Sequence, residues 1–314
     1  MPASYVHQCV ASQALNALSL CANDAQRFAA LAGAEGPDPF FFSLAPNPGG
    51  PYPPKVGSIL HTQKTDDFLL ALAGACAGSD LLRAYCLGFF THYATDTTFH
   101  PFVYAHSLTE NGYSGTEHCL LEHGLETLHY RRTGHHRGLP VQMNGFSSLS
   151  AAHKDEIARA LAAALRNVFP EHALSIRRVR ASFDDAVGLC RLLRSESGRK
   201  YRAFGGALTP FGLSKAVHAH MMPSEPPEAD IANDAHAAWA SPWQPGLTRH
   251  DSFDELFSAA VTRAKELVAC ADGAMRGRVS QASLRSCIGG FSYDSGLPWR
   301  ETCPVSEAPV VKRL

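Results

Sequence analysis

The sequence predicts an all-α protein that forms a single multi-helix domain. Long stretches place apolar residues at helical spacing, and no stretch alternates apolar and polar residues for long enough to require a sheet. No internal repeat divides the chain. Its 314 residues are enough for one large domain whose core folds without disulfide bonds. We therefore expect helices packed around one core.

The first part of the chain is expected to combine two helices with one long loop. An alanine- and leucine-rich stretch after His7 predicts the two helices. The second is expected to be capped by Asn23 or Asp24 and to end near Gly33. Proline and glycine then dominate residues 36–54, which excludes regular structure there and predicts a long, ordered loop. Loops of this length often carry function.

Four further helices are expected before residue 135. The first begins at Lys55 and holds His61 close to its start, and the second covers residues 66–78 with Asp66 and Asp67 as its expected caps. A helix over residues 79–104 is apolar on nearly all sides, so its neighbours are expected to bury it. Pro101 should end or kink this helix, because proline cannot continue the hydrogen-bond ladder. After a short loop, residues 115–132 predict the next helix.

The second half of the chain predicts helices with charged outer faces, over residues 151–168, 174–195 and 251–275. Between them, the proline- and alanine-rich residues 223–245 predict a surface excursion. For the domain organisation we expect one helical domain over residues 1–275, with its functional residues within 1–130, packing helices within 151–275, and an irregular tail over 276–314.

Charge and cysteine content exclude several classes of protein. The formal net charge is -1 and only 18% of residues are charged, which argues against a duplex nucleic acid as partner. The nine cysteines include no CxxC pair, so a disulfide framework is not expected and a reducing compartment is favoured. The first ten residues lack the features of a signal peptide, and no run of 18 apolar residues predicts a transmembrane segment. We expect a soluble, cytoplasmic protein.

The predicted central helix and the helix after it carry side chains that commonly bind metals. His92, Asp96 and His100 follow one another at intervals of four residues in an apolar stretch. His118 and Glu122 repeat that interval on the next helix. Residues four apart share one helix face, about 6 Å apart along the axis. A carboxylate buried among aromatic side chains is very unfavourable unless it is paired or metal-bound, so the pattern predicts a metal site.

The spacing further indicates at least two ions. His92 and His100 are about 12 Å apart along the helix axis, too far to share one tetrahedral ion whose bonds to nitrogen are about 2.0–2.1 Å. Either histidine can share an ion with Asp96. We therefore expect His92 and Asp96 at one ion. The second set comprises His100, His118 and Glu122. Isolated residues elsewhere are candidates for the remaining positions: His7, Asp38 and His61.

The order of these residues resembles the zinc-dependent phospholipases C and the related single-strand-specific nucleases of fungi and plants. The series comprises His7, the GPD triplet ending at Asp38, His61, HxxxD at His92 and Asp96, His100, and HxxxE at His118 and Glu122. The stretches MPASYVHQ and GFFTHYATDTTFHPF are similar to bacterial proteins grouped with that family. The resemblance covers residues 1–130. It implies an all-helical domain of the zinc phospholipase C type, with additional C-terminal helices, that holds zinc ions in a cleft.

The family's ligand roles carry over to the matching positions of this chain. His61, His92 and Asp96 resemble the ligands of one zinc ion, and Asp96 also reaches the neighbouring ion. The residues that resemble the ligands of the other site are His100, His118 and Glu122. In this chain the interval from Asp96 to His100 is shorter than in the secreted enzymes, and a helix of unbroken register accommodates it.

Asp38 matches a loop carboxylate that contacts the metals and serves as general base toward a zinc-bound water. His7 matches the first histidine of a third zinc site. The secreted enzymes complete that site with a mature amino-terminal tryptophan, where this chain offers Met1 or Pro2. The phenylalanines of residues 40–42 are expected in the core or in the wall of the cleft, where they can line an apolar substrate pocket.

The resemblance implies a zinc-dependent, phospholipase C-like phosphodiester hydrolase with two or three zinc ions per chain. Its substrate is then a phosphodiester small molecule or a phospholipid headgroup, attacked by a zinc-activated water. Two alternatives stay open. A single-strand nuclease or nucleotide phosphoesterase would use the same ions with aromatic surfaces that stack bases. A non-catalytic, metal-stabilised helical scaffold would bind partners through its C-terminal helices. The sequence makes no prediction about the oligomeric state.

Overall fold

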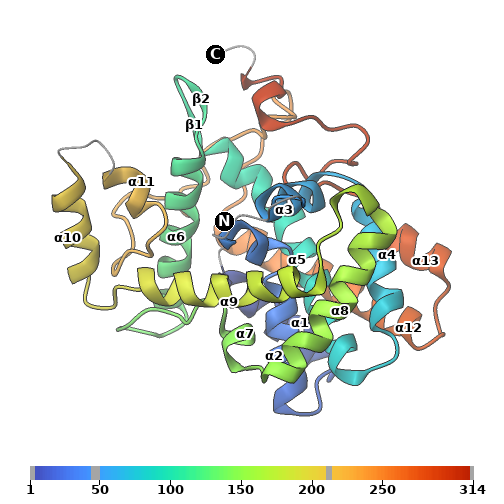
Figure 1. Cartoon of the computed structure of the whole chain (residues 1–314). Coiled ribbons are helices and arrows are strands. Elements are labelled where there is room, and N and C mark those ends of the chain that lie inside the picture. Colours follow the sequence, from blue (N-terminus) through green and yellow to red (C-terminus); the bar gives the residue numbers. More distant parts are fainter. Residues whose placement is uncertain (1–3, 44–49, 210–213, 312–314) are drawn as a thin grey trace.

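The computed structural model of the protein describes residues 4–43, 50–209 and 214–311 and confirms the all-α fold (Figure 1). The helices of the first half are α1 Ser4–Ala17, α2 Asp24–Ala34, α3 Pro53–Thr62, α4 Thr65–Cys76, α5 Asp80–Ala105 and α6 Gly115–Arg132. The later helices are α7 Asn144–Ser148, α8 Ala151–Val168, α9 Ile176–Leu193, α10 Arg199–Leu208, α11 Ser214–His218, α12 Phe253–Met275 and α13 Gln281–Ile288. Single 3₁₀ turns are η1 Asp38–Phe42, η2 Pro170–His172 and η4 Val305–Glu307.

Strands are almost absent from the described residues. The strands β1 Leu108–Thr109 and β2 Gly112–Tyr113 form an antiparallel hairpin in which Leu108 pairs with Tyr113. The hairpin joins α5 to α6, where the sequence predicts a loop. Among the described residues, no helix is long and apolar enough to cross a membrane.

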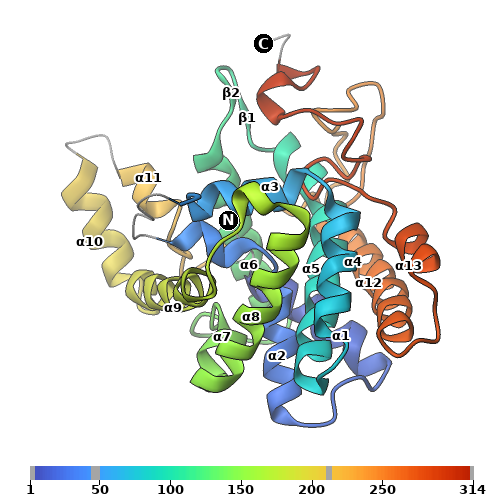
Figure 2. The ribbon, with the colours of Figure 1, turned by 45° about the vertical axis from the view of Figure 1, so that its right-hand side comes forward.

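Helix α5 forms the centre of the bundle, as its apolar sequence predicts. It begins at the N-cap Ser79, whose side chain accepts a hydrogen bond from the backbone N–H of Leu82. Most of its residues from Ala84 to Tyr104 are buried. Helices α2 and α12 make the most extensive contacts with α5, and Figure 2 shows α4 and α12 running beside it. The core of the molecule therefore lies around α5.

Pro101 does not end α5, so of the two outcomes expected from the sequence, an end or a kink, the first is wrong. The helix continues to Ala105. Proline removes one backbone donor, so the carbonyl of Thr97 cannot receive the N–H of residue 101. A loop near the C-terminus packs at this point, because Gly296 lies directly against the Thr97 carbonyl. The helix thus continues through a residue that sequence rules treat as a terminator, with the C-terminal segment packed against it at this point.

The segment before α4 also differs from the prediction. Helix α3 starts at Pro53, two residues earlier than expected, because proline is well tolerated in a first helical turn. His61 lies near the end of α3, because the helix stops one residue later at Thr62, and its expected place near the start is wrong. The loop over residues 36–54 was expected to lack regular structure, but Asp38–Phe42 form the 3₁₀ turn η1. Residues 44–49 of that loop lie outside the described residues.

The C-terminal region contains more structure than the sequence indicates. Residues 276–314 were expected to be irregular, yet α13 Gln281–Ile288 lies within them and packs against α4 and α12. The predicted excursion over residues 223–245 has no helix, but Trp239 and Trp243 in it are buried. The division of the chain at residue 275 remains a prediction.

Candidate metal centre

The eight residues that the sequence singles out as metal ligands converge in the structure. They come from five elements, with His7 on α1, Asp38 on η1, His61 on α3, His92, Asp96 and His100 on α5, and His118 and Glu122 on α6. Each is at most 9% exposed. Their roles as ligands remain predictions, but each of the eight lies in one of three groups of side chains close enough to hold a metal ion.

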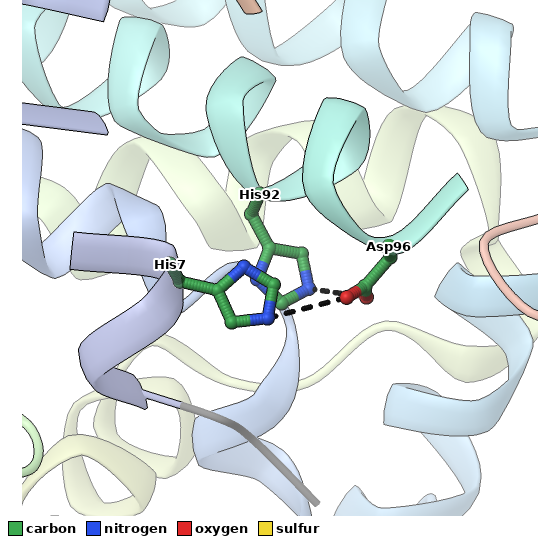
Figure 3. Close-up of side chains that lie close together, drawn as sticks. All are labelled: His7, His92 and Asp96. Carbon is green, nitrogen blue, oxygen red and sulfur yellow. Dashed lines mark ion pairs between the residues drawn. The ribbon is translucent and has the colours of Figure 1, made fainter. Parts of the chain in front are cut away.

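Asp96 lies at the junction of this cluster. Its Oδ1 is 3.2 Å from Nε2 of His7 and 3.5 Å from Nε2 of His100. Its Oδ2 is 2.9 Å from Nε2 of His92 and 3.5 Å from Nε2 of His61. Figure 3 shows His7 and His92 pointing their rings at the same carboxylate from α1 and α5. A single carboxylate thus faces four imidazoles. The two histidines on the same helix face different oxygens of Asp96, His92 facing Oδ2 and His100 facing Oδ1.

Three groups of side chains bring their ligand atoms within 4.8 Å of one another, which is close enough to hold a metal ion. The groups are His7 with His92 and Asp96, Asp38 with His61 and His92, and His100 with His118 and Glu122. The last is the second set expected from the sequence. The first two share His92, which the sequence does not reveal. None of these groups contains both His92 and His100, in keeping with their separation along α5.

Backbone carbonyls determine which nitrogen of three histidines faces the cluster. Nδ1–H of His61 donates to the carbonyl of Gly57 at 2.8 Å, and that of His92 donates to the carbonyl of Ala34 at 2.9 Å. In the same way, Nδ1–H of His100 donates to a carbonyl at 3.1 Å that belongs to residue 293. Because a carbonyl can only accept, Nδ1 carries the proton and Nε2 is the atom available to a metal.

Several buried atoms of the cluster have no hydrogen-bond partner among the described residues. They include Nδ1 of His7 and Nδ1 of His118. Nε2 of His92 and Oδ2 of Asp96 also make no hydrogen bond, although they face each other at 2.9 Å. Leaving such atoms unsatisfied costs about 1–3 kcal/mol each. Imidazole nitrogens with carboxylate oxygens form the donor set that zinc prefers. The residues therefore fit zinc, and an ion bound between Nε2 of His92 and the Asp96 carboxylate would satisfy atoms that make no hydrogen bond within the protein.

In the metal-free cluster, the carboxylates and histidines shift one another's pKa values so that histidine binds protons. Burial raises the pKa of Asp96, but the surrounding His100, His92 and His7 outweigh burial and hold this pKa well below its usual range. Burial lowers the pKa of His100, yet Asp96 and Glu122 outweigh it and raise the pKa to about 9. At neutral pH, His100 is therefore protonated and Asp96 ionised until a metal replaces protons.

A cleft of about 380 Å³ opens onto the cluster. Besides five of the eight ligand candidates, its lining includes Phe41, Ser58, Tyr104, Tyr113 and Asp294. Phe41 lies 5.3 Å from the His61 ring, whereas Phe40 and Phe42 are buried in the core, so the phenylalanine run contributes to both. The cleft is open enough for a small phosphodiester or a lipid headgroup to reach the cluster.

Sequence reasoning did not find four residues of the cleft and its floor: Tyr104, Tyr113, Tyr293 and Asp294. Tyr104 follows His100 by four residues on α5, so helical spacing alone could have identified it. Tyr293 packs 5.1 Å from the His61 ring, and Asp294 lies 3.9 Å from Nδ1 of His100. No local pattern connects these last two residues to His61 and His100, which lie at least 193 positions earlier in the chain.

Fold and site together define an all-helical protein with a candidate centre for several metal ions. The family model of zinc-dependent phospholipase C matches residues 6–173, more than half of the 314-residue chain. The protein therefore belongs to the zinc-dependent phospholipase C family. The match extends through α8 and so beyond residues 1–130, which contain the motifs of the resemblance. Neither a comparison with curated proteins nor one with solved structures returned a match.

Proposed function

We propose that the protein is a zinc-dependent phosphodiester hydrolase of the phospholipase C type. The observation that carries this proposal is the buried Asp96 carboxylate with Nε2 atoms of four histidines around it, three of which, His7, His61 and His100, also line an open cleft. Zinc in this centre would bind phosphate oxygens and lower the pKa of a bound water toward 7. The family match supports the same reaction class.

The sharing of His92 limits how many complete sites the side chains can form. Nδ1 of His92 donates to Ala34, so only Nε2 is free to bind an ion. It can complete the group of Asp38 and His61 or the group of His7 and Asp96, and not both at once. We propose two full sites, one at Asp38, His61 and His92 and one at His100, His118 and Glu122. His7 with Asp96 would contribute to a third.

Asp38 is proposed as the general base. Its Oδ1 lies 3.2 Å from Nε2 of His61, and the carboxylate lines the cleft where substrate enters. Burial raises the pKa of Asp38, but His92 and His61 outweigh it and lower the pKa, so the carboxylate is ionised at neutral pH. An ionised carboxylate in this place can orient the attacking water and take its proton.

The first experiment measures zinc content and hydrolysis of bis-p-nitrophenyl phosphate. We expect two or three zinc ions per chain and activity that a chelator removes and zinc restores. Asp38→Asn should retain zinc, because the amide oxygen can still face the ion, but should lose about 10²–10⁴-fold in rate. Asp155→Asn, at the α8 surface beside Arg180, is the control. Fewer than two ions would contradict the proposed centre, and full activity of Asp38→Asn would remove Asp38 from the role of base.

The aromatic lining of the cleft favours one second candidate. Phe41, Tyr104 and Tyr113 offer ring surfaces on which nucleic acid bases can stack. A single-strand nuclease or nucleotide phosphoesterase would use them together with the same ions. A panel of phospholipids, nucleotides and single-stranded oligonucleotides separates the two activities, and zinc-loaded protein that hydrolyses none of them would point to a non-catalytic scaffold. The unpaired cysteines favour a reducing compartment, so we also propose a cytoplasmic location.

A further inference from the structure

A loop near the C-terminus reaches the metal centre from outside the part of the chain that matches the family. We define the C-terminal loop as residues 290–299, which follow α13, whereas the family match ends at residue 173. Its two ends are joined by a hydrogen bond from Trp299 N–H to the Gly290 carbonyl at 2.9 Å. Inside, Ser292 N–H donates to the Leu297 carbonyl at 2.8 Å. The loop is therefore a closed, hairpin-like unit with Tyr293 and Asp294 near its tip.

The backbone of Tyr293 joins two of the candidate ligands. Its N–H donates to the carbonyl of His61 at 2.8 Å, at the end of α3. Its own carbonyl accepts the Nδ1–H of His100 from α5 at 3.1 Å. The Tyr293 ring, 1% exposed, packs 5.1 Å from the ring of His61 and 5.8 Å from that of His92. One residue of the loop thus holds His61 and His100 in place at the same time.

Other contacts hold the loop rigidly against the helices. Trp299 Nε1–H donates to Asp66 at 2.9 Å on α4, and Phe291 N–H donates to the hydroxyl of Tyr93 at 2.8 Å on α5. Gly296 has φ +65°, and a Cβ built there would lie 2.7 Å from the Thr97 carbonyl. Only glycine allows this close approach, which determines how near the C-terminal loop lies to the backbone of α5.

The three oriented histidines differ in where their orienting carbonyls come from. Gly57 and Ala34, which orient His61 and His92, lie inside the family-matched segment. The carbonyl that orients His100 belongs to Tyr293, far outside it. We propose that the C-terminal loop is a positioning element of the zinc centre, required for full zinc affinity of the group of His100, His118 and Glu122. This inference rests on the proposed zinc centre and assigns part of it to the C-terminal region.

Two substitutions of Gly296 test the inference. Gly296→Ala and Gly296→Val place a Cβ against the Thr97 carbonyl and should lift the loop tip, so that His100 loses its acceptor. We expect zinc affinity to fall about 10–100-fold at one ion, the usual effect of losing a partner that orients a ligand. Competition with a chelator measures zinc affinity, and the visible absorption of Co²⁺-substituted protein reports the ligand geometry. In ¹⁵N-histidine-labelled protein the Nδ1–H signal of His100 should disappear.

Gly277→Val is the matched control, because Gly277 has a similar φ of +72° but open space around its Cβ position. It carries the same backbone strain and should bind zinc like the wild type. Wild-type zinc affinity in both Gly296 variants would overturn the proposal, and if Gly296→Val does not fold, Gly296→Ala decides. The outcome is separable from the proposed function, since wild-type protein that binds zinc but hydrolyses no phosphodiester still allows the zinc measurement.

Discussion

At the scale of single residues, Asp96 determines the chemistry of the centre. It is 2% exposed, and its two oxygens face four imidazole nitrogens at 2.9–3.5 Å. A carboxylate so deeply buried is tolerated only if positive charge surrounds it. Protons on the histidines supply that charge in the metal-free protein, and zinc would supply it in the loaded protein. The same residue therefore couples metal binding to proton release.

Glu35, a second buried carboxylate, gives a prediction that is independent of zinc. It is fully buried and accepts hydrogen bonds from Ser4 Oγ at 2.7 Å and Gln8 Nε2 at 3.0 Å. Burial raises its pKa from 4.5 to about 7. Between these two values the unfolded chain loses the proton while the folded chain keeps it, so ionisation favours unfolding as the pH rises.

We therefore predict that Glu35→Gln flattens the dependence of stability on pH. Relative to the wild type, metal-free Glu35→Gln should gain about 3 kcal/mol in free energy of unfolding between pH 4.5 and pH 7. Urea unfolding across this range measures the change, with the exposed Glu228→Gln as control. If the free energies of unfolding of the wild type and Glu35→Gln change with pH in the same way, Glu35 is ionised in the native state and burial does not raise its pKa.

At the scale of elements, the contact of α2 with α5 brings His92 to its acceptor. A Cβ built at Gly88 of α5 would lie 1.9 Å from the Ala30 carbonyl, and one at Gly33 of α2 would lie 1.9 Å from the Tyr85 carbonyl. The two helix backbones can touch only because both positions are glycine. The close approach puts the Ala34 carbonyl within 2.9 Å of His92 Nδ1.

Gly88→Ala should therefore destabilise the fold and weaken the centre together. A methyl group in backbone contact forces α2 and α5 apart, which costs about 1–3 kcal/mol in free energy of unfolding and breaks the hydrogen bond to His92. Denaturant unfolding and chelator competition measure the two effects. Gly74→Ala on α4 has nothing within 4 Å of the new Cβ and should be neutral or slightly stabilising. Equal stability of the two variants would show that the helices separate without strain.

At the scale of the whole molecule, the centre ties distant parts of the chain together. Its ligand candidates come from α1, η1, α3, α5 and α6, and the C-terminal loop adds contacts from residue 293. A ligand that binds only the folded chain stabilises it by about 2.7 kcal/mol at a concentration of 100 times its Kd. Zinc should therefore raise the melting temperature of the entire bundle rather than of one segment.

This stabilisation by zinc should depend on pH with a definite sign. The pKa of His100 is raised to about 9, and that of His61 well above 6.5, so both are protonated at pH 7 in the metal-free protein. Zinc must displace these protons. As the pH falls, zinc affinity should therefore decrease about tenfold per pH unit for each proton released. The increase in Tm that zinc causes should accordingly be smaller at pH 6 than at pH 8. Calorimetry at fixed free zinc measures it. His250→Gln, an exposed histidine, should match the wild type, and a shift independent of pH would contradict the assignment.

Much of the helical architecture and all of the candidate ligands could be inferred from the sequence. The four-residue intervals of α5 and α6 are local, and backbone geometry alone places such side chains on one helix face. Apolar periodicity likewise predicts a helix over residues 151–168, and α8 begins at Ala151 and ends at Val168. The position of His61 at the end of α3 and the continuation of α5 past Pro101 were mispredicted. Helix α3 ends at Thr62, one residue after His61, and α5 continues through Pro101 where Gly296 packs against the Thr97 carbonyl.

By itself, then, the sequence determined the all-α class, the ladder of His92, Asp96 and His100 on α5, and the pair of His118 and Glu122 on α6, because each depends on local spacing along a helix. Only the tertiary structure decided that His92 belongs to two groups and that Asp96 faces His7 and His61 as well as its helix neighbours. It alone placed Tyr293 against His100. Such contacts join residues whose separation depends on how helices pack, and packing distances are set by the whole core rather than by any local pattern.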